Sequence, residues 1–182
     1  MARSKINLVW IDCEMTGLDP DRNVLIEIAV IITNYDLEIL ARGPVLAIRQ
    51  NKAKLAMMDA WNRRTHKQSG LLDRIESEGV RLAEAEEQVL KFVKRYCYKK
   101  TAPLCGNSIG QDKRFIAKYM PRLEEFLHYK VIDVSSIKLL AKEWYGGKYE
   151  PPPKLELHRA QSDIEESIAE LRYFRDNVFI PR

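Results

Sequence analysis

The sequence predicts an α/β domain in which one mixed β-sheet is flanked by α-helices. Three observations lead to this prediction. Apolar runs with strand character dominate the first 50 residues, and segments with helical spacing then alternate with short apolar runs. The chain has 182 residues, no internal repeat and no linker long enough to divide it. We therefore expect a single domain, residues 1–182, that is large enough to bury a full hydrophobic core.

Three strands are predicted in the N-terminal part. Residues 6–11 and 24–33 are apolar runs typical of buried strands, and a turn-rich stretch over 16–23 separates them. A third strand is predicted over 39–48, with an interruption at Gly43-Pro44. Successive strands joined by short turns form a meander.

Helices and short strands are predicted to alternate after residue 81. A helix is indicated by apolar side chains at three- and four-residue spacing: Leu82, Ala85, Val89, Phe92, Val93 and Tyr96. We then expect a strand over 103–106 and a helix over 111–119, which Pro121 ends or restarts. A strand over 131–134 leads into a helix over 135–145.

The C-terminal part is predicted to be a loop followed by one helix. Residues 145–154 are rich in Gly and Pro, which is typical of a loop. The last helix would bury one apolar face, made of Ile164, Ile168, Leu171 and Val178. Ser162 and Glu165 have the spacing of a capping box at the start of this helix.

Composition restricts the class of protein without naming its function. Apolar residues make up 46% and charged residues 31% of the chain, which fits a globular protein and not a disordered one. Cys13, Cys97 and Cys105 are widely spaced, which argues against a disulfide framework and a structural zinc site. Neither a secretory signal nor a membrane-spanning stretch is recognisable, so we expect a cytoplasmic protein with no membrane partner. A net charge of +4 permits contact with a polyanion.

Asp12 and Glu14 form the first candidate site, at the end of the first predicted strand. Side chains two residues apart on a strand project from the same face, so the two carboxylates would lie together. A divalent cation such as Mg²⁺ or Mn²⁺ would offset their repulsion and their partial desolvation. The pair by itself is better explained by a solvated strand end at which Asp12 caps a turn.

Three further residues strengthen the case for a catalytic site. Asp112 and Asp163 each lie near the start of a predicted helix, where an acid also interacts favourably with the helix dipole. His158 follows the Pro- and Gly-rich loop, and histidine has a pKa suited to proton transfer near neutral pH. Four carboxylates and one histidine are the groups needed for two-metal phosphodiester hydrolysis.

The chain resembles a known family at these positions. Residues 12–19 (DCEMTGLD) are similar to the first motif of the DEDD exonuclease superfamily, and residues 158–164 (HRAQSDI) to the last motif of its histidine-bearing branch. Asp112 stands where the middle motif has its Asp. Further stretches resemble oligoribonuclease in particular: residues 58–62, 65–66, 69–71, 106–112, 119–121, 128–129 and 133–135. The resemblance covers nearly the whole chain without sizeable insertions.

Two positions depart from the family pattern. Ser162 replaces the Asp often found immediately before the last acidic ligand, which puts in doubt any supporting role for an acid there. Cys13 replaces an aliphatic residue, and alternation along the strand should turn it away from Asp12 and Glu14 into the core.

The resemblance implies an RNase H-like fold and a two-metal mechanism. Two Mg²⁺ or Mn²⁺ ions would be held mainly by Asp12, Glu14, Asp112 and Asp163. His158 would act as the general base that removes a proton from the attacking water. The implied activity is 3′→5′ hydrolysis of very short RNA, down to dinucleotides, to 5′-mononucleotides.

The resemblance also implies a set of substrate-binding residues. Leu18 would wedge between two bases and Trp61 would stack on one, whereas a turn residue and a core aromatic are the structural alternatives. Ser108 and Ser135 would bind the terminal phosphate through their hydroxyl groups. Relatives are homodimers, and contributions from a second subunit would come from His66, Tyr129 and Lys130.

Three other functions are alternatives to this interpretation. An exonuclease that proofreads or trims longer strands would use the same five groups, although the chain lacks the Lys/Arg run expected for long-strand binding. A catalytically silent nucleic-acid-binding module would be expected to have lost one of the acids or the histidine. A purely structural domain leaves the grouping of acids unexplained. No partnership with duplex DNA is expected.

Overall fold

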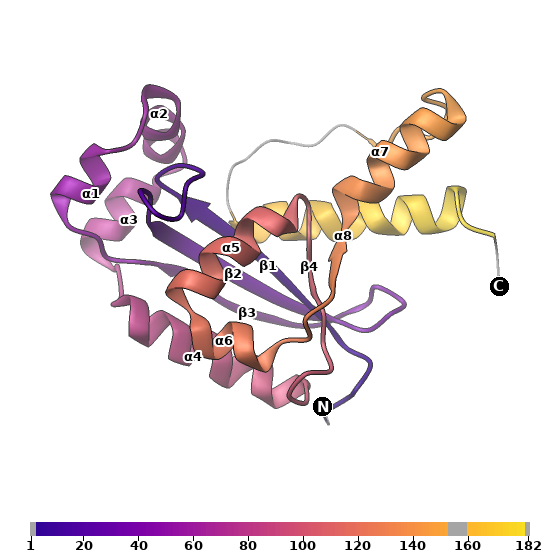
Figure 1. Ribbon diagram of the computed structural model, residues 1–182, viewed down its shortest axis with the longest axis horizontal. Helices are drawn as coiled ribbons and strands as arrows, with labels where there is room; N and C mark the ends of the chain where they lie inside the picture. The colour runs from indigo at the N-terminus through magenta and orange to yellow at the C-terminus, as the bar shows by residue number, and fades with distance from the viewer. Residues whose placement is uncertain (1–2, 153–159, 181–182) are drawn as a thin grey trace.

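A mixed five-stranded sheet forms the centre of the computed structural model, which describes residues 3–152 and 160–180 (Figure 1). The strand order is β3-β2-β1-β4-β5, with β1 Leu8–Met15, β2 Leu25–Thr33, β3 Ile39–Ala47, β4 Leu104–Gly106 and β5 Val131–Asp133. The first three strands pair antiparallel, which confirms the predicted meander. β4 pairs parallel with β1, and β5 pairs parallel with β4.

Two strands differ from their predicted extent. β1 continues to Met15, four residues beyond the apolar run, because β2 supplies backbone partners that place Asp12 opposite Ala29 and Glu14 opposite Glu27. β3 runs through Gly43 and Pro44 with a shift of register instead of breaking. Pro44 is tolerated there because β3 is an edge strand, where a missing N–H removes no central hydrogen bond.

Eight helices surround the sheet in the described parts of the chain: α1 Lys52–Ala56, α2 Ala60–Gln68, α3 Leu71–Ser77, α4 Leu82–Tyr96, α5 Ile109–Tyr119, α6 Pro121–Phe126, α7 Val134–Tyr145 and α8 Ala160–Asn177. The predictions of α4, α5, α7 and α8 are confirmed, and the chain restarts as α6 at Pro121. No helix had been predicted over residues 52–77. The predicted capping box is wrong, because Ser162 lies inside α8 and Glu165 pairs with Arg42 at 2.8 Å.

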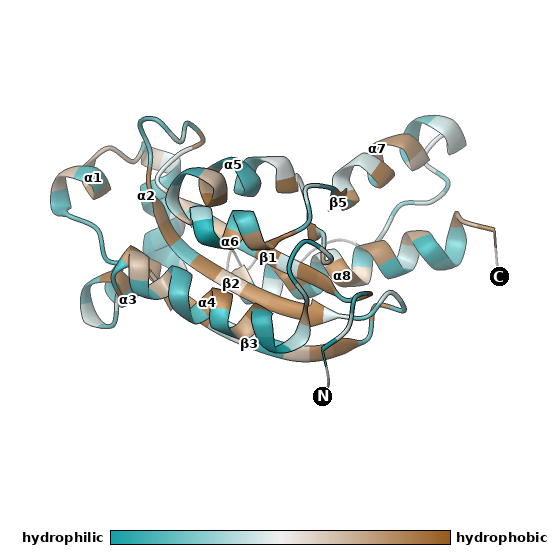
Figure 2. Cartoon of the chain, turned by 60° about the horizontal axis from the view of Figure 1, so that its bottom comes forward, coloured by the Kyte–Doolittle hydropathy of each residue, from teal (hydrophilic) through white to brown (hydrophobic). Residues whose placement is uncertain are grey.

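Hydrophobic residues pack on both faces of the sheet. On one face, Val9, Ile11 and Cys13 of β1 pack with side chains of α4, α5 and α6. On the other face, Leu8 and Trp10 pack with side chains of α7 and α8. Figure 2 shows hydrophobic residues along β2, inside the domain, and hydrophilic residues on the outer surface of α4. Cys13 is buried, as predicted from strand alternation.

A further core region lies where α1, α2 and α3 cover the end of the sheet. Val24, Ile26 and Ala47 pack there against Met58 and Leu71. In the ranges that the structure describes, no helix is both long and apolar enough to cross a membrane.

Candidate metal-binding active site

The candidate site continues the pattern of alternating side chains along β1. Leu8 and Trp10 face α7 and α8, so Asp12 and Glu14 project from the same side of the strand. They lie beyond the paired residues of β4, which match Val9 and Trp10 of β1. The carboxylates therefore occupy the end of the strand where the neighbouring strand has stopped.

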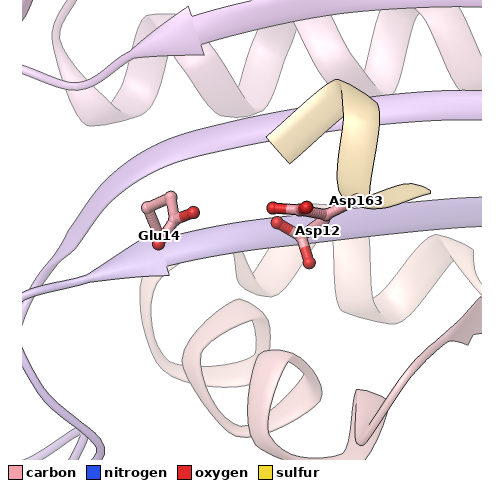
Figure 3. Close-up of side chains that lie close together, drawn as sticks. All are labelled: Asp12, Glu14 and Asp163. Carbon is pink, nitrogen blue, oxygen red and sulfur yellow. The ribbon is translucent and has the colours of Figure 1, made fainter. Parts of the chain in front are cut away.

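Helix α8 brings a third carboxylate to this position. Asp163 lies in the first turn of α8, which packs against β1 and β2. One oxygen each from Asp12, Glu14 and Asp163 lies within 4.8 Å of the others. Figure 3 shows Asp12 and Asp163 facing each other, with Glu14 beside them along the strand. Residues 151 positions apart in the chain thus form one cluster.

Asp112 lies next to this cluster but is not one of the three grouped carboxylates. It is in the first turn of α5, and its Oδ1 accepts a hydrogen bond of 2.9 Å from the backbone N–H of Cys13. Because Cys13 separates Asp12 from Glu14, this bond ties α5 directly to the acidic end of β1. Asp112 is 7% exposed.

The acids of the site resist ionisation. The pKa of Asp12 is held well above its ordinary value by burial and then by the charges of Asp112 and Glu14. Burial, followed by the charges of Asp163 and Glu27, raises the pKa of Glu14 to about 8. Burial also raises the pKa of Asp112 to about 7, against the hydrogen bond from Cys13 N–H, which lowers it.

This donor set fits a divalent cation. The cluster supplies oxygen ligands from three carboxylates, the type that hard cations prefer. A cation would also favour the ionised forms that burial and mutual repulsion disfavour in its absence. The same raised pKa values are typical of functional sites.

Two partners of the cluster were not assigned to it from the sequence. His66 of α2 is 2% exposed, donates from Nε2 to the carbonyl oxygen of Met15 at 3.1 Å, and has Nδ1 3.9 Å from Glu14 Oε2. The resemblance implies that His66 acts in the active site of a second subunit. In this structure its ring is instead buried beside Glu14 of its own chain.

The second is Glu27, which lies opposite Glu14 on β2 and forms an ion pair with Arg74 of α3. In the sequence, Glu27 is an acid inside the apolar run of residues 24–33, and this was the signal that could have identified it. Its partner Arg74 was not detectable, because it belongs to a segment for which no helix had been predicted.

The predicted general base cannot be placed. His158 lies outside the described residues, so its position relative to Asp12 and Asp163 stays a prediction. The described chain resumes at Ala160, three residues before Asp163.

Ser108 and Ser135, the two residues predicted to bind a terminal phosphate, lie together. Their hydroxyl oxygens are 3.1 Å apart, and Ser108 N–H donates to Ser135 Oγ at 2.8 Å. Ser108 precedes α5 in a left-handed conformation (φ 49°), and Ser135 is in the first turn of α7. Asn107 accepts a hydrogen bond from Ser135 Oγ at 3.1 Å and donates to Ser167 and Glu170. This network joins the pair to α8.

The other predicted binding residues lie at the surface. Leu18 is 71% exposed and Trp61 is 54% exposed, so the alternative of a core aromatic at Trp61 is wrong. Tyr129 and Lys130 precede β5, at the opposite end of that strand from Asp133. Tyr129 is 70% exposed, and the Lys130 Nζ lies 5.8 Å from the centre of its ring.

Comparisons with known proteins identify the family to which the chain belongs. The sequence profile of the RNase_T family, described as exonuclease, matches residues 9–171. An oligoribonuclease of Paracidovorax citrulli is 48% identical over 181 residues, covering 100% of this chain and 94% of that protein. An oligoribonuclease of Pseudomonas aeruginosa is 53% identical over 171 residues, covering 94% of this chain and 95% of that protein.

Solved structures show a similar fold at low sequence identity. The zinc-bound form of the E. coli ExoI–ssDNA complex has a TM-score of 0.76 and 10% identity, covering 98% of this chain and 41% of that chain. Exonuclease I of Methylocaldum szegediense has a TM-score of 0.70 and 17% identity, covering 94% of this chain and 41% of that one. This chain therefore spans less than half the length of these neighbours, which establish the fold alone. The matched profile and the full-length relatives place the chain in the oligoribonuclease family of RNase_T-type exonucleases.

Proposed function

We propose that this protein is a 3′→5′ exoribonuclease that hydrolyses very short oligoribonucleotides, down to dinucleotides, to 5′-mononucleotides. The observation that carries the proposal is the cluster of Asp12, Glu14 and Asp163 within 4.8 Å, in a chain 48% and 53% identical to oligoribonucleases along nearly its whole length. Neither a solvated strand end nor a helix-dipole partner explains why three acids gather at one point.

The proposed cofactor is Mg²⁺ or Mn²⁺, two ions per site, held by Asp12, Glu14, Asp163 and Asp112. Such ions activate water and stabilise charge on the attacking and leaving oxygens. The protein's part is to hold its ligands in place. Cys13 N–H keeps Asp112 against β1, and α8 holds Asp163 over the strand. We assign to His158 the removal of the proton from the attacking water.

Ser108 and Ser135 are the proposed binding site for the terminal phosphate. Two hydroxyl groups 3.1 Å apart lie near the N-terminal ends of α5 and α7, where the helix dipoles favour an anion. The N–H groups of Ser108 and Ser135 themselves donate to Asp133 Oδ1. A site for a terminal phosphate suits a short substrate, because few internal phosphates are available for contact. Exposed Leu18 and Trp61 offer apolar surface for the two bases.

We also propose that the protein is a cytoplasmic homodimer. The outer side of α7 exposes a group of large apolar residues: Leu139, Leu140, Trp144 and Tyr145. Burying such a surface against a second copy would remove it from water. Tyr129 and Lys130 lie away from their own chain's acids, in positions from which they would serve the partner's site.

A digestion of labelled RNAs of two, five, ten and twenty nucleotides tests the proposal. We expect the dinucleotide to be cut fastest with Mg²⁺ or Mn²⁺, and no cutting in chelator. Asp163→Asn should abolish turnover, whereas Asp176→Asn, the matched change in the last turn of the same helix, should not. Turnover that persists in chelator would overturn the metal mechanism. Equal or faster cutting of the twenty-nucleotide strand would favour the alternative, an exonuclease of longer strands.

A further inference from the structure

A groove lined by basic residues lies away from the acidic cluster. It has a volume of about 430 Å³ and runs between α4, the start of α6 and the N-terminal segment. Five cations line it: Arg3, Lys91, Lys94, Arg95 and Arg122. Glu87 is the only acid among its lining residues, so the groove has an excess of four positive charges. We call this surface the α4–α6 groove.

The cations of the α4–α6 groove have no carboxylate partners in the described parts of the chain, where no ion pair within 4.0 Å includes any of the five. Elsewhere on the surface, cations pair with acids, as Lys99 does with Glu125 at 2.5 Å and Lys118 with Asp21 at 2.7 Å. Five cations gathered around a single acid repel one another, and an anion in the groove would relieve that repulsion.

The walls of the groove are held by specific contacts. Lys91, Lys94 and Arg95 project from one side of α4, above buried Leu90. The facing wall includes Arg122, whose backbone N–H donates to the buried Glu86 of α4 at 2.7 Å. This bond fixes the first turn of α6 against α4, so the separation of the two basic walls is set by the fold.

Arg3 lines the groove and lies beside the aromatic ring of Tyr98, which is not itself a lining residue. Ser4 N–H donates to the carbonyl oxygen of Tyr96 at 2.9 Å, which holds the N-terminal segment beside the end of α4. The guanidinium carbon of Arg3 lies 5.9 Å from the centre of the Tyr98 ring, which is 43% exposed. Arginine suits phosphate through paired N–H groups, and an exposed aromatic ring suits a nucleobase.

We infer that the α4–α6 groove is a second, non-catalytic binding site for the phosphates of single-stranded RNA. Leu90 belongs to the core on the Cys13 face of the sheet, whereas Asp12 and Glu14 project from the opposite face. An RNA segment in the groove is therefore separated from the carboxylates of Asp12 and Glu14 by the sheet and does not compete for them. The groove would retain RNA fragments near the enzyme without being required to cut a dinucleotide.

Backbone amide shifts of the ¹⁵N-labelled protein in chelator test the site without hydrolysis. Three probes are compared: a seven-nucleotide RNA, tripolyphosphate and a seven-residue polyglutamate. We expect the RNA to shift the amides of Lys91 to Arg95 and Arg122 at a lower concentration than the other two probes. Unmoved groove amides would overturn the inference. Equal or tighter binding of tripolyphosphate would also overturn it, since the site would then serve free polyphosphate. Equal or tighter binding of polyglutamate would overturn it as well, because it would indicate a non-specific anion surface.

A pair of variants with equal charge change provides the second test. Lys91→Gln with Lys94→Gln removes two groove cations, and Lys52→Gln with Lys54→Gln removes two from α1. For single-stranded RNA, losing two phosphate contacts lowers the slope of log affinity against log salt by about 1.4. Wild type should therefore lose roughly sevenfold more affinity than the groove variant between 50 and 200 mM salt. Identical salt dependence in the two variants would contradict the inference.

Dinucleotide hydrolysis separates this inference from the proposed function. Both double variants should cut a dinucleotide at the wild-type rate with Mg²⁺, because neither changes the acidic cluster. A selective loss of that activity in the groove variant would contradict a non-catalytic role. Failure of the wild type to cut dinucleotides would overturn the proposed function and leave the binding measurements in chelator valid.

Discussion

Replacing Glu14 with Gln should stabilise the metal-free protein at high pH. The folded structure raises the pKa of Glu14 from 4.5 to about 8, chiefly by burial and then by the charges of Asp163 and Glu27. Between these values the unfolded chain has released the proton and the folded protein retains it. The unfolded state then binds fewer protons, so the free energy of unfolding falls as pH rises from 4.5 to 8. Below pH 4.5 both states are protonated and this cost is absent.

The size of the effect follows from the same two values. A difference between 4.5 and about 8 corresponds to roughly 4–5 kcal/mol of stability lost by pH 8 or above. For a chain of 182 residues, that loss lowers the melting temperature by about 10 °C. Gln has nearly the shape of Glu and no charge to release, so Glu14→Gln removes this contribution to the pH dependence.

Thermal unfolding in chelator, recorded from pH 4.5 to 8.5, measures the prediction. Wild type and Glu14→Gln should melt at similar temperatures at pH 4.5 and diverge as pH rises, with the variant more stable. Glu76→Gln, at an exposed position of α3, is the control and should follow wild type. Mg²⁺ added at pH 8 should raise the wild-type melting temperature more than that of Glu14→Gln. Parallel curves for wild type and Glu14→Gln, or a less stable variant at pH 8, would refute the reasoning.

Three further outcomes are expected. Arg74→Met leaves the buried carboxylate of Glu27 without its partner and should lower the free energy of unfolding, measured in urea, by roughly 2–3 kcal/mol. This is less than the cost of breaking a fully buried pair, because the Arg74 side chain is 37% exposed. Adding Glu27→Gln should recover part of that loss, and a double variant no more stable than Arg74→Met would contradict the ion pair. Thr33→Val removes the acceptor of the 2.9 Å hydrogen bond from Trp10 Nε1 and should cost about 1–3 kcal/mol, measured in the same way. Calorimetric titration of the metal-free protein with Mg²⁺ at pH 7 should release protons, because the pKa values of Glu14 and Asp112 are raised to about 8 and about 7. Titration in buffers of different ionisation enthalpy checks this, and equal heats would refute it.

The local spacing of apolar residues was sufficient to predict most of the sheet and four of the helices. Strands and helices differ in the spacing of their apolar side chains, so the meander, α4 and α8 were detectable from the residues alone. The same alternation placed Asp12 and Glu14 on one face and Cys13 on the other. The helices over 52–77 lack a long apolar stripe, since their buried side chains are few and pack on the end of the sheet.

Sequence by itself therefore determined the class of fold and the acids from which a metal site is built. Tertiary structure decided which residues meet: Asp163 joins Asp12 and Glu14, and His66 is buried beside Glu14. It also gathered basic residues from three segments into the α4–α6 groove, although the chain has no Lys/Arg run. The physical reason is that alternation and helical spacing are local properties. Burial, pKa and charge partners depend on side chains that only the packing of α2, α4, α6 and α8 brings together.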